Sequence, residues 1–319
     1  MQGQNPSQSS RVDKRPVVSR ETVSLAALLQ QGRARLASVF PLPEAQAILR
    51  RLLSHYWPGW EAIWLATRGA APFPPEKLSA WQAALHRLAQ GEPLAYVLGE
   101  VEFGGLSLKV APGVFIPRPE TEEWAFWVAR QLTALSPRTV LDVGTGSGAL
   151  ALFLARAFPS ARVFAVDKSP LALSIAAQNA ERLGLAVQWA LRTFGLEPLP
   201  ADWPTEWDLI VSNPPYIPWT FWDQTEPRVR SYEPPEALFC RDFSLYAKLG
   251  AFASSYLSEK GLLVCEIFPP YADEIKNNFE RLGFKVHLYC DFQGRARWVV
   301  AYRGEFFTFA PASGSSSAR

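Results

Sequence analysis

Short apolar segments alternate with helical stretches from residue 139 onward, and this alternation restricts the fold more than any other feature. Continuous apolar strands separated by helices are typical of a parallel sheet whose two faces are both covered. The pattern therefore predicts a doubly wound α/β domain, with two final strands that form an antiparallel hairpin at its edge. The expected strands are 139–143, 162–166, 208–212, 261–267, 285–290 and 297–302, and the expected helices are 149–158, 170–183, 243–257 and 271–282.

The chain before this domain has a different character. Leucines recur at helical spacing early in the sequence, as at Leu25, Leu28 and Leu29, and predict a small helical domain. A β-hairpin with Tyr96–Leu98 in its first arm is expected to link the two domains. The predicted boundaries are 1–22 for a disordered tail, 23–92 for the helical domain, 93–112 for the linker, 113–305 for the α/β domain and 306–319 for a flexible tail.

The net charge argues against nucleic acid as the main partner. The chain has 32 Lys and Arg against 30 Asp and Glu, a formal charge of +2. Residues 1–20 carry four basic and one acidic side chain, and Arg319 adds one more positive charge, so residues 21–318 stand at −2. Proteins that grip a phosphate backbone usually carry a basic excess. We therefore expect that no direct contact with nucleic acid is required.

Cysteine and histidine are too sparse and dispersed to predict a metal site. No CxxC pair is present, and so few cysteines suit a reducing cytosol. No apolar run reaches the roughly 20 residues that span a bilayer, so we expect a cytoplasmic protein without a membrane contact. The residues concerned are Cys240, Cys265, Cys290, His55, His86 and His287.

A glycine-rich turn after the first predicted strand points to a nucleotide-like cofactor. Gly144, Gly146 and Gly148 alternate with Thr145 and Ser147, and glycines let a backbone approach a ligand closely. The second strand ends at Asp167, 25 residues after Asp142, and a carboxylate there accepts hydrogen bonds from ribose hydroxyls. Strand, GxGxG, helix, strand and acid is the layout of S-adenosyl-L-methionine (SAM) sites, although a simple packing turn has the same local sequence. Asp142 is expected to reach the amino group of SAM directly or through water.

The sequence Asn213-Pro214-Pro215-Tyr216 follows a later strand, where doubly wound sheets present ligands. The prolines fix the backbone and hold Asn213 extended, which makes a stiff platform. Carbonyl oxygens of Asn213 and Pro214 offer two acceptors for the hydrogens of a planar amino group, which Tyr216 can cover with its ring. Such acceptors orient the nitrogen lone pair and stabilise the positive charge that develops during methylation. The motif therefore indicates transfer of a methyl group to a conjugated nitrogen, in an amide or in a flipped base.

Taken together, these blocks resemble the HemK/PrmC family of protein-glutamine methyltransferases over roughly residues 25–303. The resemblance is carried by 91–99, by Phe115–Glu122, by 144–148 with Asp167, by 213–216, by Glu233–Phe239 and by 294–297. It implies a Rossmann-like methyltransferase sheet with a small N-terminal helical domain. It also implies methyl transfer from SAM to the glutamine side chain in the Gly-Gly-Gln motif of peptide chain release factors, with S-adenosyl-L-homocysteine as product.

The resemblance also assigns roles to individual residues. Asn213, Pro214 and Tyr216 are the expected catalytic residues, and Pro215 joins them in binding the glutamine amide. SAM is expected to contact Gly144, Thr145, Gly146, Ser147, Gly148 and Asp167, with Asn213 close to the methyl group. The helical domain would contact the release factor, and a monomer is expected.

The sequence departs from the family pattern in two places, and two alternative functions stay open. Arg192 and Thr193 replace the family's usual adenine contact, and Phe268 stands where the family usually has glycine. An adenine-N6 or guanine-N2 nucleic-acid methyltransferase would use the same motif at 213–216, but it predicts a basic groove or a recognition domain. A non-catalytic SAM-binding protein is the third possibility, and the intact motif counts against it.

Overall fold

The computed structural model describes residues 22–133, 136–291 and 293–304. Apart from residue 22, the predicted tails 1–22 and 306–319 lie outside these ranges. Internal contacts divide the chain into two compact units, Met1–Gln90 and Gly91–Arg319. In the described part, no helix is long and apolar enough to cross a membrane.

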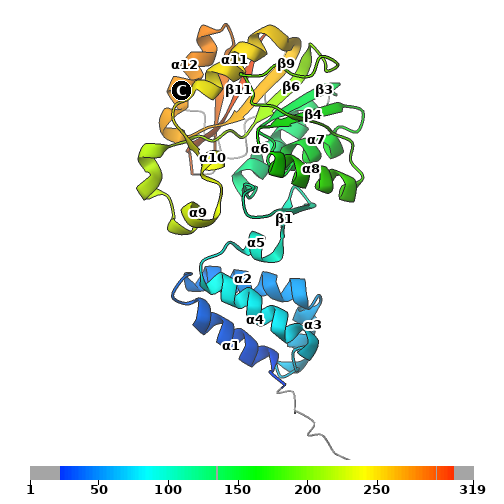
Figure 1. The fold of residues 1–319 in the computed structure, drawn as a ribbon, viewed down its shortest axis with the longest axis vertical. Coiled ribbons are helices and arrows are strands. Elements are labelled where there is room, and N and C mark those ends of the chain that lie inside the picture. The colour runs from blue at the N-terminus through cyan, green and yellow to red at the C-terminus, as the bar shows by residue number, and fades with distance from the viewer. Residues whose placement is uncertain (1–21, 134–135, 292, 305–319) are drawn as a thin grey trace, which may run out of the picture. The chain divides into compact units, whose positions relative to one another are not determined.

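The described part of the first unit is helical, as predicted (Figure 1). The side chain of Ser24 accepts a hydrogen bond from the Ala27 N–H and so begins the first helix, while prolines lie in the first turn of the second and fourth. Leucines on one face of each long helix, together with Trp81, are buried in the core. The helices are α1 (Leu25–Leu36), α2 (Leu42–Tyr56), α3 (Trp60–Thr67) and α4 (Pro75–Ala89).

The second unit opens with a short helix and a hairpin. The predicted hairpin is confirmed, because β1 (Glu100–Phe103) and β2 (Leu106–Lys109) pair antiparallel around two glycines. The prediction of a strand at Tyr96–Leu98 is wrong, since α5 (Leu94–Leu98) is helical there. Pro93 precedes that helix, and Gly99, with a φ of 75°, ends it in the left-handed conformation that favours glycine.

A seven-stranded sheet forms the centre of the second unit and confirms the predicted α/β class. Strand order is β10-β11-β9-β6-β3-β4-β5, and the five strands from β9 to β5 pair in parallel. The final hairpin is also confirmed: β11 pairs antiparallel with β9 on one side and with β10, the edge strand, on the other. The strands are β3 (Thr139–Val143), β4 (Arg162–Asp167), β5 (Gln188–Leu191), β6 (Trp207–Ser212), β9 (Leu257–Glu266), β10 (Lys285–Cys290) and β11 (Ala296–Tyr302).

Helices cover both faces of this sheet (Figure 1). Neighbouring residues of β3 point to opposite faces: Val140 packs into one hydrophobic cluster and Leu141 into the other. The first cluster includes Trp124 of α6 (Pro119–Leu132) and side chains of α7 (Ala149–Ala157) and α8 (Pro170–Leu183). The second includes side chains of α11 (Ser244–Tyr256) and α12 (Ala272–Arg281).

Short elements fill the connection between β6 and α11 and the turn after β9. The connection from β6 to α11 therefore runs over residues 213–243. These elements are β7 (Ile217–Pro218), η1 (Trp219–Gln224), α9 (Pro227–Tyr232), α10 (Pro235–Leu238), β8 (Phe239–Cys240) and η2 (Pro269–Tyr271).

Candidate active site

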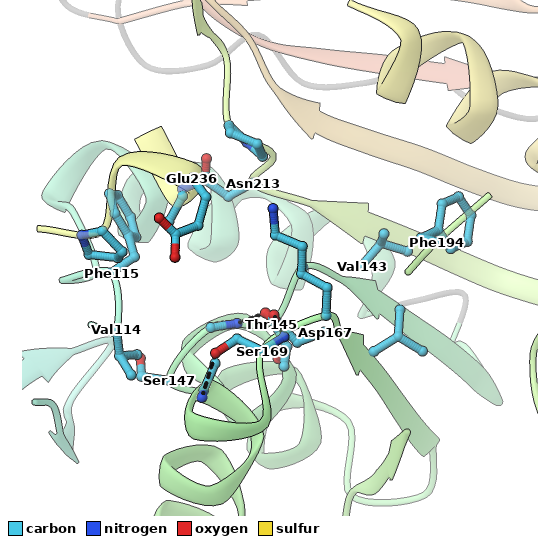
Figure 2. A pocket seen from close by; sticks show the side chains of 18 of the residues that line it. Val114, Phe115, Val143, Thr145, Ser147, Asp167, Ser169, Phe194, Asn213 and Glu236 are labelled. Atoms are coloured by element: carbon cyan, nitrogen blue, oxygen red, sulfur yellow. Dashed lines mark hydrogen bonds between the residues drawn. The ribbon is translucent and has the colours of Figure 1, made fainter. Parts of the chain in front are cut away.

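The carboxyl ends of the parallel strands meet at one edge of the sheet, and a cavity of about 290 Å³ lies there. The strand register sets Val143 beside Val166 and Ser212, so the residues that follow β3, β4 and β6 come together. Figure 2 shows Phe115 and Phe194 on opposite sides of the cavity, with Asp167 on one wall and Asn213 and Glu236 across from it. Further lining residues are Gly113, Val114, Pro117, Thr121, Val143, Gly144, Thr145, Gly146, Ser147, Lys168, Ser169, Arg192, Thr193, Pro215, Pro234, Ala237, Leu245 and Lys248.

The predicted glycine turn borders this cavity. Gly144 and Gly146 have φ values of 76° and 58°, and a Cβ built on either would meet no atom within 4 Å. Both glycines therefore leave open space where a ligand can approach the backbone. Gly148 is not among the lining residues; a Cβ there would lie 3.1 Å from the Cβ of Ala176, so this glycine serves helix packing.

Asp142 lies behind the turn and is fully buried. Its Oδ2 accepts hydrogen bonds from Thr145 Oγ1 at 2.6 Å and from the Ala151 N–H at 3.1 Å, and it does not line the cavity. Burial raises the pKa of this carboxyl to about 7. Asp142 thus ties the glycine turn to the start of α7, and its expected contact with the amino group of SAM, directly or through water, stays a prediction.

Asp167 lies at the end of β4 and lines the cavity, as predicted for a ribose-binding carboxylate. Its Oδ2 accepts a hydrogen bond from the Gly146 N–H at 2.9 Å, and its Oδ1 accepts one from the Ser169 N–H at 2.8 Å. These bonds fix the carboxylate against the glycine turn. Each oxygen keeps a lone pair for a further donor, because a carboxylate has about four acceptor positions.

Asn213 reaches the cavity from the end of β6. Its Nδ2 donates a hydrogen bond to Thr121 Oγ1 at 2.9 Å, so its Oδ1 is the amide atom free to accept one. Ser212, the residue before it, is buried and donates from Oγ to the Val143 carbonyl at 2.8 Å. Of the four residues at 213–216, Asn213 and Pro215 line the cavity, whereas Pro214 and Tyr216 do not.

Tyr216 is held from two sides. Its hydroxyl donates to Glu266 Oε1 at 3.0 Å, and its ring stacks on Phe268 with 6.3 Å between ring centroids and 16° between planes. Burial, followed by the neighbouring Glu266 carboxylate, raises the pKa of Tyr216 well above its usual range, so the phenol stays protonated. The family departure at Phe268 therefore packs on the motif. The expected contact of Tyr216 with a substrate stays a prediction.

Two of the segments that resemble the family meet through an ion pair whose carboxylate is buried. Glu233 is 3 % exposed; one carboxylate oxygen accepts a hydrogen bond from the Arg118 guanidinium and the other accepts one from the Ile116 N–H at 3.3 Å. Arg118 belongs to the segment 115–122 and Glu233 to the segment 233–239, both of which line the cavity. Sequence reasoning identified the two segments and missed their pairing.

The side of the cavity that contains Phe194 is formed by the residues that follow β5 and by α11. Arg192, Thr193 and Phe194 line it, and the Phe194 ring packs edge-on against Phe252 with 5.2 Å between centroids. Thr193 N–H donates to Glu197 Oε2 at 2.6 Å, which closes a turn in the loop that follows β5. Lys248 also lines this side, and no sequence signal marked it.

Comparison with known proteins gives the family. Residues 27–99 match the family described as PrmC N-terminal domain, and residues 106–219 match the Methyltransferase small domain. A release factor glutamine methyltransferase from Deinococcus radiodurans is 36 % identical over 284 residues, which cover 88 % of this chain and 99 % of that protein. This chain belongs to the release factor glutamine methyltransferase family. It is therefore a SAM-dependent methyltransferase.

A second relative agrees with this family, and a solved structure agrees with the fold. A release factor glutamine methyltransferase from Geobacter sulfurreducens is 39 % identical over 228 residues, which cover 71 % of this chain and 78 % of that protein. A crystal structure of the hMettl16 catalytic domain in complex with a 3′UTR hairpin aligns with a TM-score of 0.52 at 16 % identity, covering 72 % of this chain and 83 % of that one. At that identity the likeness shows the fold alone.

The cavity suits the cofactor of this family. Gly144 and Gly146 leave open space beside the backbone, and Asp167 keeps acceptor positions for hydroxyl groups. Ser147 adds a buried hydroxyl that lines the cavity and has no hydrogen-bond partner among the described residues. An unsatisfied buried hydroxyl at a cavity wall is well placed for a polar ligand. In the same described part, no three His, Cys, Asp or Glu side chains gather to hold a metal ion.

Proposed function

We propose that this protein transfers a methyl group from SAM to the side-chain nitrogen of the glutamine in the Gly-Gly-Gln motif of a peptide chain release factor. The observation that carries the proposal is the orientation of Asn213 in the cavity. Its Nδ2 is engaged by Thr121, so its Oδ1 is left to accept a hydrogen from a substrate amide. The relatives named release factor glutamine methyltransferase support the choice of substrate.

The cofactor side of the cavity is assigned to the glycine turn and β4. The turn at 144–148 would accommodate the methionine part, and Asp167 would accept the ribose hydroxyls. Arg192, Thr193, Phe194 and Leu245 would surround the adenine, in place of the family's usual acidic contact. When bound, SAM supplies a methyl group on a positively charged sulfur.

The chain's own residues bind and orient the glutamine amide. Asn213 Oδ1 and the Pro214 carbonyl would each accept one hydrogen of the amide nitrogen and hold it planar. Pro215 and Tyr216 complete the binding site, and the stacking of Tyr216 on Phe268 fixes the ring in place. These acceptors stabilise the positive charge that grows on nitrogen, while alignment with the methyl group supplies much of the rate. The methylated nitrogen loses its proton readily, so the mechanism needs no strong base.

The same proposal assigns a role to each domain and a partner to the helical domain. The helical domain, 23–92, would contact the release factor, the segment 93–112 would act as linker, and 113–305 would carry the chemistry in a monomer. Residues 91–319 contain 21 basic and 25 acidic side chains, which is not the excess that a nucleic-acid groove requires. A nucleic-acid methyltransferase is therefore the weaker alternative.

Incubation with isotope-labelled SAM separates these functions. The purified protein is mixed with release factor, with release factor whose Gly-Gly-Gln glutamine is replaced by alanine, or with DNA and RNA. We expect label only in the unaltered release factor. Label in nucleic acid, or label in release factor that survives loss of the glutamine, would contradict the proposal.

A further inference from the structure

A buried carboxylate behind the cavity collects three side-chain hydrogen bonds. Glu266 ends β9, is 2 % exposed, and does not line the cavity. Its Oε2 accepts from Thr121 Oγ1 at 2.6 Å and from Trp124 Nε1 at 3.1 Å, and its Oε1 accepts from Tyr216 at 3.0 Å. Two of these donors lead to the substrate motif: Tyr216 belongs to it, and Thr121 contacts Asn213.

The direction of these hydrogen bonds is fixed by what each group can do. The indole N–H of Trp124 can only donate, so Glu266 Oε2 accepts from it. Burial raises the pKa of Glu266, while the hydrogen bonds from Thr121, Trp124 and Tyr216 favour its ionised form, in which both oxygens only accept. Thr121 has one hydroxyl hydrogen and gives it to that oxygen. Its remaining role toward Asn213 is that of acceptor, which requires the Nδ2 side of the amide to face it.

We propose that Glu266, acting through Thr121, orients the Asn213 amide so that Oδ1 and not Nδ2 faces the substrate nitrogen. The inference rests on the proposed function and adds a positioning residue to it. Glu266 also holds Tyr216, so one carboxylate aligns both side chains of the motif. The residues concerned lie on three elements that meet here: α6, the loop after β6, and the end of β9.

Steric fit alone does not select this orientation, since the oxygen and nitrogen of an amide are nearly the same size. If Glu266 no longer accepts, the Thr121 hydrogen can turn to Asn213 Oδ1 and the amide rotates by half a turn. The amide then presents N–H groups to a substrate nitrogen that needs acceptors. The inference therefore predicts loss of rate with little loss of SAM binding.

Four variants test the hydrogen-bond direction. Glu266→Gln keeps it, because the Gln oxygen takes the Oε2 position facing the two donors and its NH2 faces the Tyr216 hydroxyl, which can accept. Glu266→Met removes the acceptor, and Thr121→Val removes the hydroxyl that donates to it. Thr121→Ser keeps a hydroxyl at this position. We expect kcat to fall about 100-fold in the Met and Val variants, the usual effect of one lost hydrogen bond to developing charge. We expect it to stay within about threefold in the Gln and Ser variants.

Three comparisons separate positioning from structural damage. The Kd for SAM, measured by calorimetry, should stay within about twofold of wild type in all four variants. Thr133→Val makes the same change at the end of α6, where the hydroxyl bonds to the Ala129 carbonyl, and should leave kcat unchanged. The double variant Glu266→Met/Thr121→Val should be no slower than either single variant, because both act on one orientation.

Nuclear magnetic resonance gives a readout that needs no turnover. The side-chain NH2 signal of Asn213, assigned by its loss in Asn213→Asp, should exchange slowly with water in wild type and Glu266→Gln. It should exchange faster in Glu266→Met, where the group turns to the open cavity. If Glu266→Met fails to fold, Thr121→Val against Thr121→Ser makes the same comparison.

Each contrary result has a distinct meaning. Wild-type turnover in both Glu266→Met and Thr121→Val, or equal loss in Glu266→Gln and Glu266→Met, overturns the inference. Loss of SAM affinity in step with kcat also overturns it, in favour of a structural role. A wild-type protein that methylates no release factor instead sinks the proposed function, and the NH2 exchange rates still decide the orientation.

Discussion

Replacing Gly146 by alanine separates backbone strain from cofactor binding, because the chain contains a matched control. Gly146 and Gly184 have φ values of 58° and 65°, and a Cβ on either would meet no atom within 4 Å. Gly146 borders the cavity, whereas Gly184 ends α8 away from it. Alanine at either position takes on left-handed backbone strain of about 1 to 2 kcal/mol.

The strain lowers both melting temperatures by the same amount, roughly 2 to 8 °C for a domain of this size. Only in Gly146→Ala does the new methyl group occupy the space where SAM approaches the turn. We therefore expect its SAM affinity to fall at least about 10-fold, which is about 1.4 kcal/mol, while Gly184→Ala binds as wild type does. Differential scanning fluorimetry and isothermal titration calorimetry measure the two effects. Equal SAM affinities in the two variants would refute the assignment of the glycine turn.

Two further substitutions test the acids of the site. Asp167→Ala should weaken SAM binding by about 10-fold or more in calorimetry, because the ribose hydroxyls lose their acceptor; unchanged affinity would refute that role. Asp142→Asn should flatten the pH dependence of stability. Burial raises the pKa of Asp142 from 3.8 to about 7, so the folded protein holds a proton that the unfolded chain releases between these values. The contribution of Asp142 to the free energy of unfolding therefore falls as pH rises from about 4 to 7, by up to about 4 kcal/mol, and is then level. Urea titrations at pH 5 and pH 8 should show a smaller fall in the variant, and an equal fall would show that Asp142 does not titrate in this range.

The sheet was predictable because its strands carry their own pattern. The parallel strands at the centre of the sheet are buried on both faces and therefore contain continuous apolar runs, as in Leu209–Val211. Strand β5 has only four residues, two of them exposed, and lacked that signal. Tyr96–Leu98 looked like a strand by composition, but the proline before it and the glycine after it favour one helical turn. Local sequence therefore predicted most of the long buried elements, but it missed the long buried helix α6 and missed or misjudged the short elements.

The parts of the site that directly follow a strand of the sheet were predictable. The glycine turn, Asp167 and Asn213 follow directly from strands of the sheet, and the structure brings them to one cavity. The contact between Thr121 and Glu266 joins residues 145 positions apart, and that between Arg118 and Glu233 joins residues 115 apart. Such pairings depend on how α6 and the loop after α9 pack against the sheet, which no local pattern in one sequence specifies.

Mass spectrometry of the release factor after reaction tests the central claim most directly. Wild-type protein and SAM should add the mass of one methyl group to the peptide that contains Gly-Gly-Gln, and fragmentation should place it on the glutamine side chain. Asn213→Ala should bind SAM within about twofold of wild type and add no methyl group at matched times. A methyl group on another residue, or full methylation by Asn213→Ala, would contradict the account.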